Sequence, residues 1–551
     1  MLLIDLVKKE SEGQRGVIAL AVVASAASNA AILIIINSAV KTASWESLNF
    51  QLLVMFALAI GIYIAGLKFT LDRSARIFEN MIHRIRTRLI AKLAASELIA
   101  VEQIGKAEIY KRLTQETTVI SESQALLTAA LHAAIMVAFT AIYVFTLSPI
   151  AFVTILVIVL AGISIYRGKE VVVRESFKRT IGTEIRFFGV ATHLIDGLKE
   201  VKMSSRRGDE LGAELTAISR TVRDQKLRTI SVYNDTSIFS QCFFYVLIGT
   251  IVFLLPRISA TYGAVISQLV AAVLFMMGPL SSVVSALPAL SKANMAAESI
   301  HVLEHKIDEM FGHHRPASTR KRDVQPISFE QDIELQDLEF TYPDPSGAGA
   351  FSIGPVSFTI RKGEVIFIIG GNGSGKSTLM KLLTGLYRPN SGAVKVDGRA
   401  LNWGEIQRYR ELFSVIFADF HLFEKLYGAA VDEEKVASLL RLMDIFGKTR
   451  YTNGKFTTLE LSTGQRKRLA LVSLLLENRS IAVFDEWAAD QDPEFRKYFY
   501  EVLLHDLKRQ GKTVIAITHD DHYFQHCDKL IKMDLGTVEF VQDIANRAPG
   551  H

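Results

Sequence analysis

The stretch GEVIFIIGGNGSGKST, residues 363–378, decides how the second half of the chain folds. Its apolar run, residues 365–369, is typical of a buried strand, and the next eight residues fit the pattern G-x-x-x-x-G-K-[ST]. Glycines in such a loop let backbone N–H groups turn inward and hold phosphate oxygens at the start of a helix, which we expect near Ser377. The stretch therefore predicts a strand, a phosphate-binding loop and a helix, the central unit of an α/β P-loop nucleotide-binding domain.

The loop also predicts which groups hold a nucleotide. Lys376 is expected to reach the β- and γ-phosphates of ATP, and the Ser377 hydroxyl is expected to ligate Mg²⁺. The other expected ATP contacts in this loop are Gly370, Gly371, Asn372, Gly373, Ser374, Gly375 and Thr378. A P-loop alone also occurs in kinases, GTPases and motor proteins, so the choice among them depends on the rest of the chain.

Composition divides the 551-residue chain into two unlike parts. Residues 1 to about 300 carry long runs of Ala, Val, Ile and Leu, whereas from about 330 the chain alternates strands and helices like a soluble protein. The net charge of +5 is modest and its excess lies between the apolar runs, so we do not infer nucleic-acid binding. The two cysteines, Cys242 and Cys527, provide neither a disulfide framework nor a zinc cluster, which favours a reducing cytoplasm for the second half.

Six apolar stretches in the first half are candidates to cross a bilayer, which takes about 20 mostly apolar residues. They are residues 16–40, 51–70, 126–147, 150–166, 235–256 and 262–284. The first is too long for the apolar core of a signal peptide and lacks a small-residue cleavage site before a soluble domain. The third and fourth are separated by a tight turn at Pro149. We therefore predict an α-helical membrane domain with six transmembrane helices.

Charge predicts the orientation of these spans. Basic residues cluster between spans two and three and between spans four and five, whereas the opposite loops hold only Lys41 and Arg257. The positive-inside rule then places both termini, both long loops and the ATP-binding half in the cytoplasm. The long loops are helical in pattern, so we expect the spans to continue about 35–40 Å into the cytoplasm if each arm has roughly 25 residues. Such arms would give a cytoplasmic motor domain segments to push on. The alternative is that they are solvated amphipathic linkers.

Polar residues inside the spans are candidates for a substrate cavity, because facing lipid is unfavourable for them. We name His132, Asn234, Asp235 and Gln241 as the cavity candidates. Hydrogen bonds between helices are the alternative for each of them. The predicted domains are the membrane domain at 1–310, a polar linker at 311–328 and an ATPase domain at 329–546.

A second stretch narrows the choice of P-loop protein: ELSTGQRKRLALVSLLLENRSIAVFDE, residues 460–486. We expect an amphipathic helix to begin at LSTGQ, and Asp485 and Glu486 directly follow a predicted buried strand at 481–484. Here the chain resembles the ABC transporter family, whose signature is LSGGQ and whose Walker B strand ends in Asp-Glu. The resemblance covers the whole chain, because six spans followed by one nucleotide-binding domain is the half-transporter layout of exporters in that family.

The resemblance implies roles for further residues. Asp485 resembles the Mg²⁺-holding Walker B aspartate, Glu486 the base that orients the attacking water, and His519 the histidine that contacts the γ-phosphate. Tyr342 stands where the family places an aromatic that stacks on adenine, with an ordinary tyrosine at a strand end as the alternative. The residues implied to contact ATP or the dimer interface from a second subunit are Ser462, Gly464, Gln465 and Asp492. Two chains are then required, and a homodimer is the simplest assembly.

Three features depart from the family pattern. Thr463 stands where glycine is usual, and the D-loop region reads WAADQD. Ala418 occupies the place of the Q-loop glutamine, so the neighbouring Asp419 is a candidate Mg²⁺ ligand, with a water molecule as the alternative. Asp490 receives no role and is expected to be solvated.

The departures occur together in one branch of the family. IGGNGSGKST, F-x-D, DEWAADQDP and HDDHYF resemble the motifs of exporters of cyclic and modified peptides in Gram-negative bacteria, including pyoverdine-type siderophore precursors, cyclic lipopeptides and lasso microcins. The resemblance implies ATP-driven export of such a cargo across the bacterial inner membrane, with ATP and Mg²⁺ as cofactors. The implied partners are a second copy of the chain, a peptide or small-molecule cargo and the lipid bilayer, but no nucleic acid. The alternatives are a lipid or drug exporter, an importer or channel on the same scaffold, and a regulatory membrane ATPase.

Overall fold

The computed structural model describes residues 3, 5, 7, 15–42, 49–258, 265–310, 325–343, 351–428 and 431–544. The chain forms two compact units, one of Met1–Ala91 with Ala107–His305 and one of Lys92–Lys106 with Lys306–His551. Most of the predicted linker, from residue 311 to residue 324, lies outside the described residues. The predicted domain limits therefore stay predictions.

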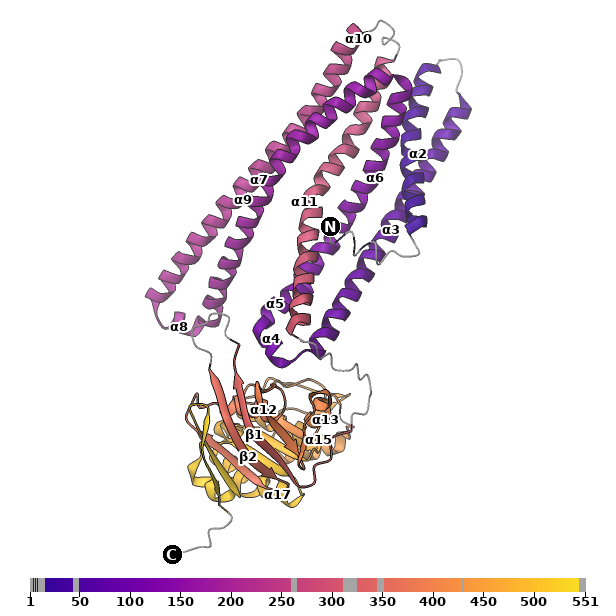
Figure 1. Ribbon diagram of the computed structural model, residues 1–551. Helices are drawn as coiled ribbons and strands as arrows, with labels where there is room; N and C mark the ends of the chain where they lie inside the picture. The colour runs from indigo at the N-terminus through magenta and orange to yellow at the C-terminus, as the bar shows by residue number, and fades with distance from the viewer. Residues whose placement is uncertain are drawn as a thin grey trace, which may run out of the picture. The chain divides into compact units, whose positions relative to one another are not determined.

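The first unit is helical (Figure 1). The long helices are α2 (Arg15–Thr42), α3 (Phe50–Ala95), α6 (Thr117–Leu147), α7 (Pro149–Asp196), α9 (Ser205–Gly249) and α11 (Ile266–Met310). The short elements between them are α4 (Leu98–Ile104), α5 (Lys106–Lys111), η1 (Arg112–Glu116), α8 (Leu198–Lys202), η2 (Thr250–Leu254) and α10 (Leu255–Ile258). Ser148 caps α7 by accepting a hydrogen bond from the backbone N–H of Ala151 (3.1 Å), with Pro149 at the first helical position. This cap explains the tight turn predicted between spans three and four.

The described part of every predicted span lies in helix, except residue 265, a turn residue directly before α11. Among the described residues, four helical stretches are by length and composition able to cross a membrane: Gly16–Lys41, Phe50–Ala95, Lys106–Leu147 and Ile266–Glu309. At the predicted fourth and fifth spans the structure has shorter apolar helical segments, Pro149–Gly162 and Cys242–Leu254. Large side chains on these helices stay exposed, including Leu20 at 71% and Phe253 at 77%, as expected of surfaces that lipid covers.

The helices extend well beyond the thickness of a bilayer. Helices α3, α7, α9 and α11 contain 46, 48, 45 and 45 residues. At about 1.5 Å per residue each is roughly 70 Å long, against about 30 Å for a hydrocarbon core. Helices α7 and α9 run side by side and are joined through α8 (Figure 1). The prediction that the spans continue as helical arms is confirmed.

The second unit is built on two sheets. The six-stranded sheet has the order β12 (Thr537–Asp543), β11 (Lys529–Asp534), β3 (Val365–Gly370), β10 (Thr513–Ile517), β9 (Ile481–Asp485) and β6 (Phe413–Ile416). The four-stranded sheet has the order β2 (Ser352–Arg361), β1 (Asp332–Thr341), β4 (Ser391–Val396) and β5 (Arg399–Ala400). A small pair, β7 (Tyr451–Thr452) and β8 (Lys455–Phe456), stands apart. The helical elements are α12 (Lys376–Leu383), η4 (Trp403–Glu405), α13 (Ile406–Arg410), α14 (Glu433–Leu442), α15 (Thr463–Glu477), η5 (Trp487–Asp490), α16 (Pro493–Tyr498), η6 (Phe499–Leu503), α17 (Leu504–Arg509) and η7 (Asp521–His526).

Both faces of the central strands are buried, and this explains their continuous apolar sequences. On β3, Val365 and Phe367 join the apolar cluster that contains residues of α15 and α17, whereas Ile366 and Ile368 join the cluster that contains residues of β1 and β2. Strands β3, β10, β9 and β6 are parallel to one another, and such strands have no solvated face. Each fully buried aliphatic or aromatic side chain of this kind stabilises the fold by about 1.5–3 kcal/mol.

Helix α4, which follows the arm formed by α3, belongs to the second unit. Leu98 is partly buried and packs against the apolar cluster that includes Ile366. The Glu102 carboxylate accepts hydrogen bonds from the Lys381 ammonium (3.0 Å) and from the Tyr387 hydroxyl. Burial, together with the bond to Glu102, raises the pKa of the Tyr387 hydroxyl above its ordinary value. Within the second unit, α4 is thus attached beside α12, the helix that follows the P-loop.

Candidate functional site

The P-loop has the geometry expected from its glycines. Gly375 has φ +97° and stands immediately before α12, which begins at Lys376. A Cβ atom at Gly370 would lie only 2.3 Å from the Met533 carbonyl oxygen, so no larger residue fits there without displacement of the backbone. The predicted strand, loop and helix are all present, and the helix starts one residue before the predicted position.

The Lys376 ammonium lies inside the loop. The Lys376 residue is only 5% exposed, and its ammonium donates to the carbonyl oxygens of Gly370 (3.0 Å) and Gly371 (2.9 Å). The Ser374 hydroxyl is also buried and makes no hydrogen bond to any described residue. A buried cation and an unpaired hydroxyl on an inward-turned loop are suited to phosphate oxygens.

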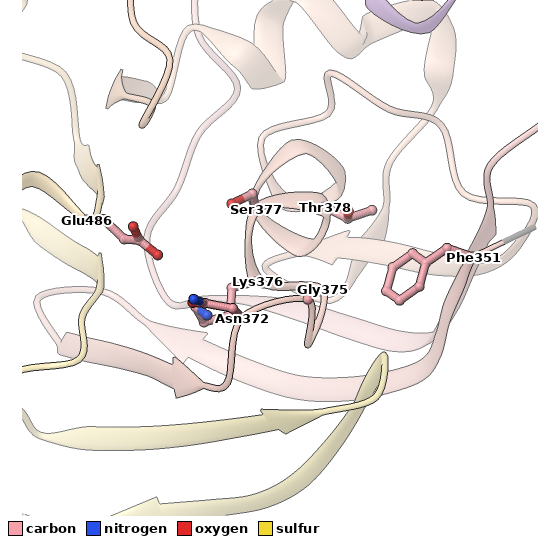
Figure 2. A pocket seen from close by; sticks show the side chains of 8 residues that line it. Phe351, Asn372, Gly375, Lys376, Ser377, Thr378 and Glu486 are labelled. Carbon is pink, nitrogen blue, oxygen red and sulfur yellow. The ribbon is translucent and has the colours of Figure 1, made fainter. Parts of the chain in front are cut away.

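A cavity of about 300 Å³ opens beside this loop. It is lined by Phe351, Asn372, Gly373, Gly375, Lys376, Ser377, Thr378 and Glu486. Figure 2 shows Glu486 at one end and Phe351 at the other, with the P-loop side chains between them. The cavity therefore presents an aromatic ring at one end, cationic and hydroxyl groups in the middle and a carboxylate at the other end.

Parallel pairing of strands brings the segments that carry the predicted catalytic residues to one edge of the sheet. In the register of the sheet Ile517 of β10 lies opposite both Ile368 of β3 and Asp485 of β9. The segments that follow these strands, which carry the P-loop, Glu486 and His519, consequently meet at one edge of the sheet. The Nε2 atom of His519 lies 3.3 Å from Oε1 of Glu486, and both side chains are partly exposed.

Asp485 is the buried carboxylate of the site. It is 2% exposed, its Oδ1 atom has no hydrogen-bond partner among the described residues, and its Oδ2 atom accepts a long bond from the Ala418 N–H (3.5 Å). Burial raises the pKa of the Asp485 carboxyl, although the Ala418 N–H and the Ser377 hydroxyl act in the opposite direction. An unpaired carboxylate oxygen beside the Ser377 hydroxyl is a donor set that fits Mg²⁺. Asp419 is exposed, and its proposed part as a ligand stays a prediction.

The predicted signature motif forms the start of α15 and does not line the cavity. Ser462 caps the helix, because its hydroxyl accepts from the Gln465 N–H (3.4 Å) while the Gln465 side chain accepts from the Ser462 N–H (3.2 Å). Such a capping box stabilises a helix by about 1 kcal/mol. Gly464 and Asp492 also stand outside the set of residues that line the cavity. Asp492 caps α16 and pairs with Arg468. The hydrogen bond from the Phe495 N–H and, to a smaller extent, the charge of Arg468 lower the pKa of the Asp492 carboxyl.

The aromatic end of the cavity is formed by a residue that sequence analysis did not name. The Tyr342 hydroxyl is hydrogen-bonded with the Thr378 hydroxyl (3.1 Å), and the Tyr342 ring packs edge-on against Phe340 and Tyr387. The ring that lines the cavity is Phe351, 42% exposed, which sequence analysis did not single out. Its only sequence signal is an aromatic residue directly before β2, too common to identify a site. The stacking role of Tyr342 stays a prediction.

The cavity candidates of the membrane part are placed in different surroundings. His132 is buried on α6 with its ring tilted against Tyr63 (5.9 Å between centroids), and its Nε2 atom has no described hydrogen-bond partner. Asn234 and Asp235 are exposed on α9, and the side chain of Gln241 lies outside the described residues. Within the described residues, nothing joins these four candidates into one site.

Comparison with known proteins agrees with this geometry. A family model described as ABC transporter matches residues 353–489. ATP-binding protein SyrD of Pseudomonas syringae pv. syringae is 32% identical over 539 residues, which cover 93% of this chain and 92% of that protein. The ATP-dependent lipid A-core flippase of Bordetella avium is 24% identical over 405 residues, 70% of this chain and 66% of the flippase. The energy-coupling factor transporter ATP-binding protein EcfA1 of Mycoplasma genitalium is 34% identical over 195 residues, 33% of this chain and 70% of EcfA1.

Replacing the buried carboxylate of Asp485 should stabilise the nucleotide-free protein while it strongly lowers activity. Because the pKa of Asp485 is raised in the folded state, its ionised form destabilises the fold at neutral pH, and this effect disappears as the pH falls through the raised pKa. We expect Asp485→Asn to raise the melting temperature by a few degrees at pH 7, with a smaller difference in acid, and to lower Mg²⁺-dependent ATP hydrolysis roughly 100-fold or more. Thermal unfolding and an ATPase assay check both effects. A lower melting temperature for the variant would refute the stated cause.

Removing the aromatic ring at the end of the cavity should weaken ATP binding. Stacking of a base on an aromatic side chain contributes about 1–3 kcal/mol, and 1.4 kcal/mol corresponds to a tenfold change in affinity. We expect Phe351→Ala to raise the KM for ATP roughly tenfold and Phe351→Trp to preserve it. Tyr342→Phe is the matched control, because it removes the hydroxyl bond to Thr378 but keeps a ring. An unchanged KM in Phe351→Ala would show that the base binds elsewhere.

Proposed function

Because the chain belongs to the ABC transporter family and is an ATPase coupled to transport, we propose that it exports a cyclic or modified peptide across the bacterial inner membrane as a homodimer. The ATPase part of this proposal rests on one observation, the cavity that is lined by Lys376 and Glu486. The cargo part is supported by the four motifs typical of peptide exporters and by the likeness to SyrD, which extends over nearly the whole chain.

Each end of the cavity has a chemical task in this proposal. The Lys376 ammonium, which now bonds the loop carbonyls, is in position to turn to the β- and γ-phosphates of ATP. The Glu486 carboxylate accepts a proton from the attacking water, and His519, 3.3 Å away, holds that carboxylate toward the terminal phosphate. Ser377 and Asp485 would hold Mg²⁺, which supplies positive charge against the negative charge that develops on the phosphate oxygens.

A second copy of the chain completes the site. Ser462, Gly464 and Gln465 lie at the start of a helix, where backbone N–H groups attract anions, yet they do not line the cavity of their own chain. We infer that they close on the nucleotide of a partner chain, so that a homodimer has two equivalent sites.

The arms connect nucleotide closure to the membrane part. Glu102 on α4 holds Lys381 and Tyr387, which belong to α12 and to the segment just after it. Because α12 begins at the P-loop, a shift of this helix on ATP binding displaces α4 and the arm that precedes it. This connection is made by Glu102, Lys381 and Tyr387. It does not involve Ala418, which stands where the family usually has a glutamine.

Lipid export is the second candidate function, and the likeness to the lipid A-core flippase favours it. A regulatory ATPase without transport is the third, and Ala418 is the feature that favours it. Inside-out membrane vesicles distinguish the three. We expect ATP-dependent accumulation of a labelled cyclic lipopeptide with the native chain and none with Lys376→Ala. Accumulation of labelled lipid A instead would support lipid export, and ATP hydrolysis without flux of any cargo would support regulation.

Glu486→Gln should separate ATP binding from turnover. Glutamine keeps the shape of the side chain but cannot accept the proton of the attacking water, so we expect kcat to fall by roughly 100-fold to 10,000-fold while ATP is still bound. The trapped nucleotide should hold two chains closed, which size-exclusion chromatography with light scattering or cysteine cross-linking detects. Normal turnover in this variant would remove Glu486 from its proposed role.

Glu102→Ala should uncouple hydrolysis from transport. The substitution removes the acceptor of Lys381 and Tyr387 but leaves the residues that line the cavity intact. We expect ATP hydrolysis without cargo to stay within about twofold of the native rate, whereas its stimulation by cargo and vesicle accumulation are lost. Glu330→Ala is the control, because Glu330 forms an exposed ion pair with Lys362 in the same unit. Full cargo stimulation in Glu102→Ala would refute this route.

A further inference from the structure

Lys467 is a buried lysine beside the turn that carries Glu486. It lies on α15 and is 5% exposed. Its ammonium donates to the backbone carbonyl oxygen of Glu486 (2.6 Å) and pairs with the Asp490 carboxylate (2.7 Å). A buried ammonium is unfavourable unless it is paired, so Asp490 serves as its counter-ion. Sequence analysis assigned Asp490 no role and expected it to be solvated; its side chain is 48% exposed, and the structure adds the pair with Lys467.

The backbone of Glu486 adopts a conformation that its surroundings must support. Its φ angle is +49°, in the left-handed region that residues other than glycine rarely adopt. Its N–H donates to the Ile517 carbonyl (3.2 Å), and its own carbonyl accepts from Lys467. With both backbone groups held, the direction in which the Glu486 side chain leaves the backbone is set, and its carboxylate lies 3.3 Å from His519.

A second bond runs in the opposite sense between the same two segments. The indole N–H of Trp487 donates to the backbone carbonyl of Lys467 (2.8 Å), and Trp487 is 1% exposed and stacked on Phe499. Gly464, at the start of α15, allows the close approach, because a Cβ atom there would lie 2.7 Å from the Asp490 carbonyl oxygen. Helix α15 and the residues from Glu486 to Asp490 are thus joined at several points.

We propose that Lys467, with Asp490 as its counter-ion, is the positioning residue that sets the direction of the Glu486 carboxylate. The inference rests on the proposed role of Glu486 as the base for ATP hydrolysis. Lys467 does not line the nucleotide cavity, so it acts on turnover through the Glu486 backbone and not on ATP binding.

The test compares kcat with KM in the full chain reconstituted in lipid nanodiscs. Lys467→Met replaces the ammonium by an apolar end of similar length and leaves the Glu486 carbonyl without its donor. We expect kcat for ATP hydrolysis to fall roughly 10-fold to 100-fold, with the KM for ATP and the affinity for Mg²⁺-ATP changed by less than about threefold.

Lys529→Met is the matched control. The Lys529 side chain is equally buried, at 6% exposure, and its ammonium likewise bonds a backbone carbonyl, that of Thr359 (2.7 Å), and a carboxylate, that of Glu364 (2.9 Å). It lies opposite Ile366, toward the end of β3 away from the P-loop. We expect Lys529→Met to lower the melting temperature and to leave kcat within about twofold of the native value.

A third variant separates positioning from stability. Asp490→Asn keeps the ammonium on the Glu486 carbonyl but removes its counter-ion, so it should lower the melting temperature more than Lys467→Met and kcat less. If Lys467→Met does not fold, Asp490→Asn and Lys467→Gln are compared in the same way, and native kcat in both overturns the proposal. Native kcat in Lys467→Met, a proportional rise in KM, or an equal loss of kcat in Lys529→Met also overturns it.

Measuring Glu486→Gln alongside distinguishes a failure of the positioning role of Lys467 from a failure of the role of Glu486 as base. If Glu486→Gln is inactive while Lys467→Met turns over normally, only the positioning role fails. If Glu486→Gln keeps native turnover, the role of Glu486 as base fails, and the positioning role fails with it.

Discussion

The parallel pairing of β3, β10 and β9 is the constraint on which the site depends. The apolar residues of these strands are buried on both faces, which fixes the register, and the register places Ile368, Ile517 and Asp485 side by side. The segments after the strands then bring Lys376 and Glu486 to one cavity and place His519 beside Glu486. One consequence is unfavourable to stability, because the buried strand β9 ends in the charged Asp485, whose pKa is raised by burial. We attribute the charged Asp485 at this buried strand end to its proposed role in holding Mg²⁺.

Short motifs and apolar periodicity predicted most of the architecture. The P-loop, the strand before Asp485, the start of the signature helix and the helical stretches of the membrane part all follow from residues adjacent in the chain, and the structure confirms them. The contacts that sequence analysis missed join residues far apart. Phe351 lines the cavity because β2 packs beside the P-loop, and Asp490 is paired because α15 folds back against it. Glu102 bonds Lys381 across 279 residues. Patterns among neighbouring residues do not predict contacts between distant segments.

The membrane part was predictable in outline but not in its cargo site. Apolar length gives the spans, and the helices of 45 to 48 residues show why the loops between spans had a helical pattern. The polar candidates do not behave alike: His132 is buried in helix packing, whereas Asn234 and Asp235 are exposed on α9. The proposal of a peptide cargo therefore rests on motifs of the motor part and on the likeness to SyrD, not on a pocket in the membrane part.

A structure of the full chain in lipid with Mg²⁺ and a non-hydrolysable ATP analogue tests the arrangement most directly. We predict two chains and two nucleotides, each with its base against Phe351, its phosphates on the loop of Lys376, and its γ-phosphate between Glu486 of the same chain and the partner's Ser462. A nucleotide enclosed by one chain alone, or one whose γ-phosphate lies away from Glu486, would contradict the proposed site.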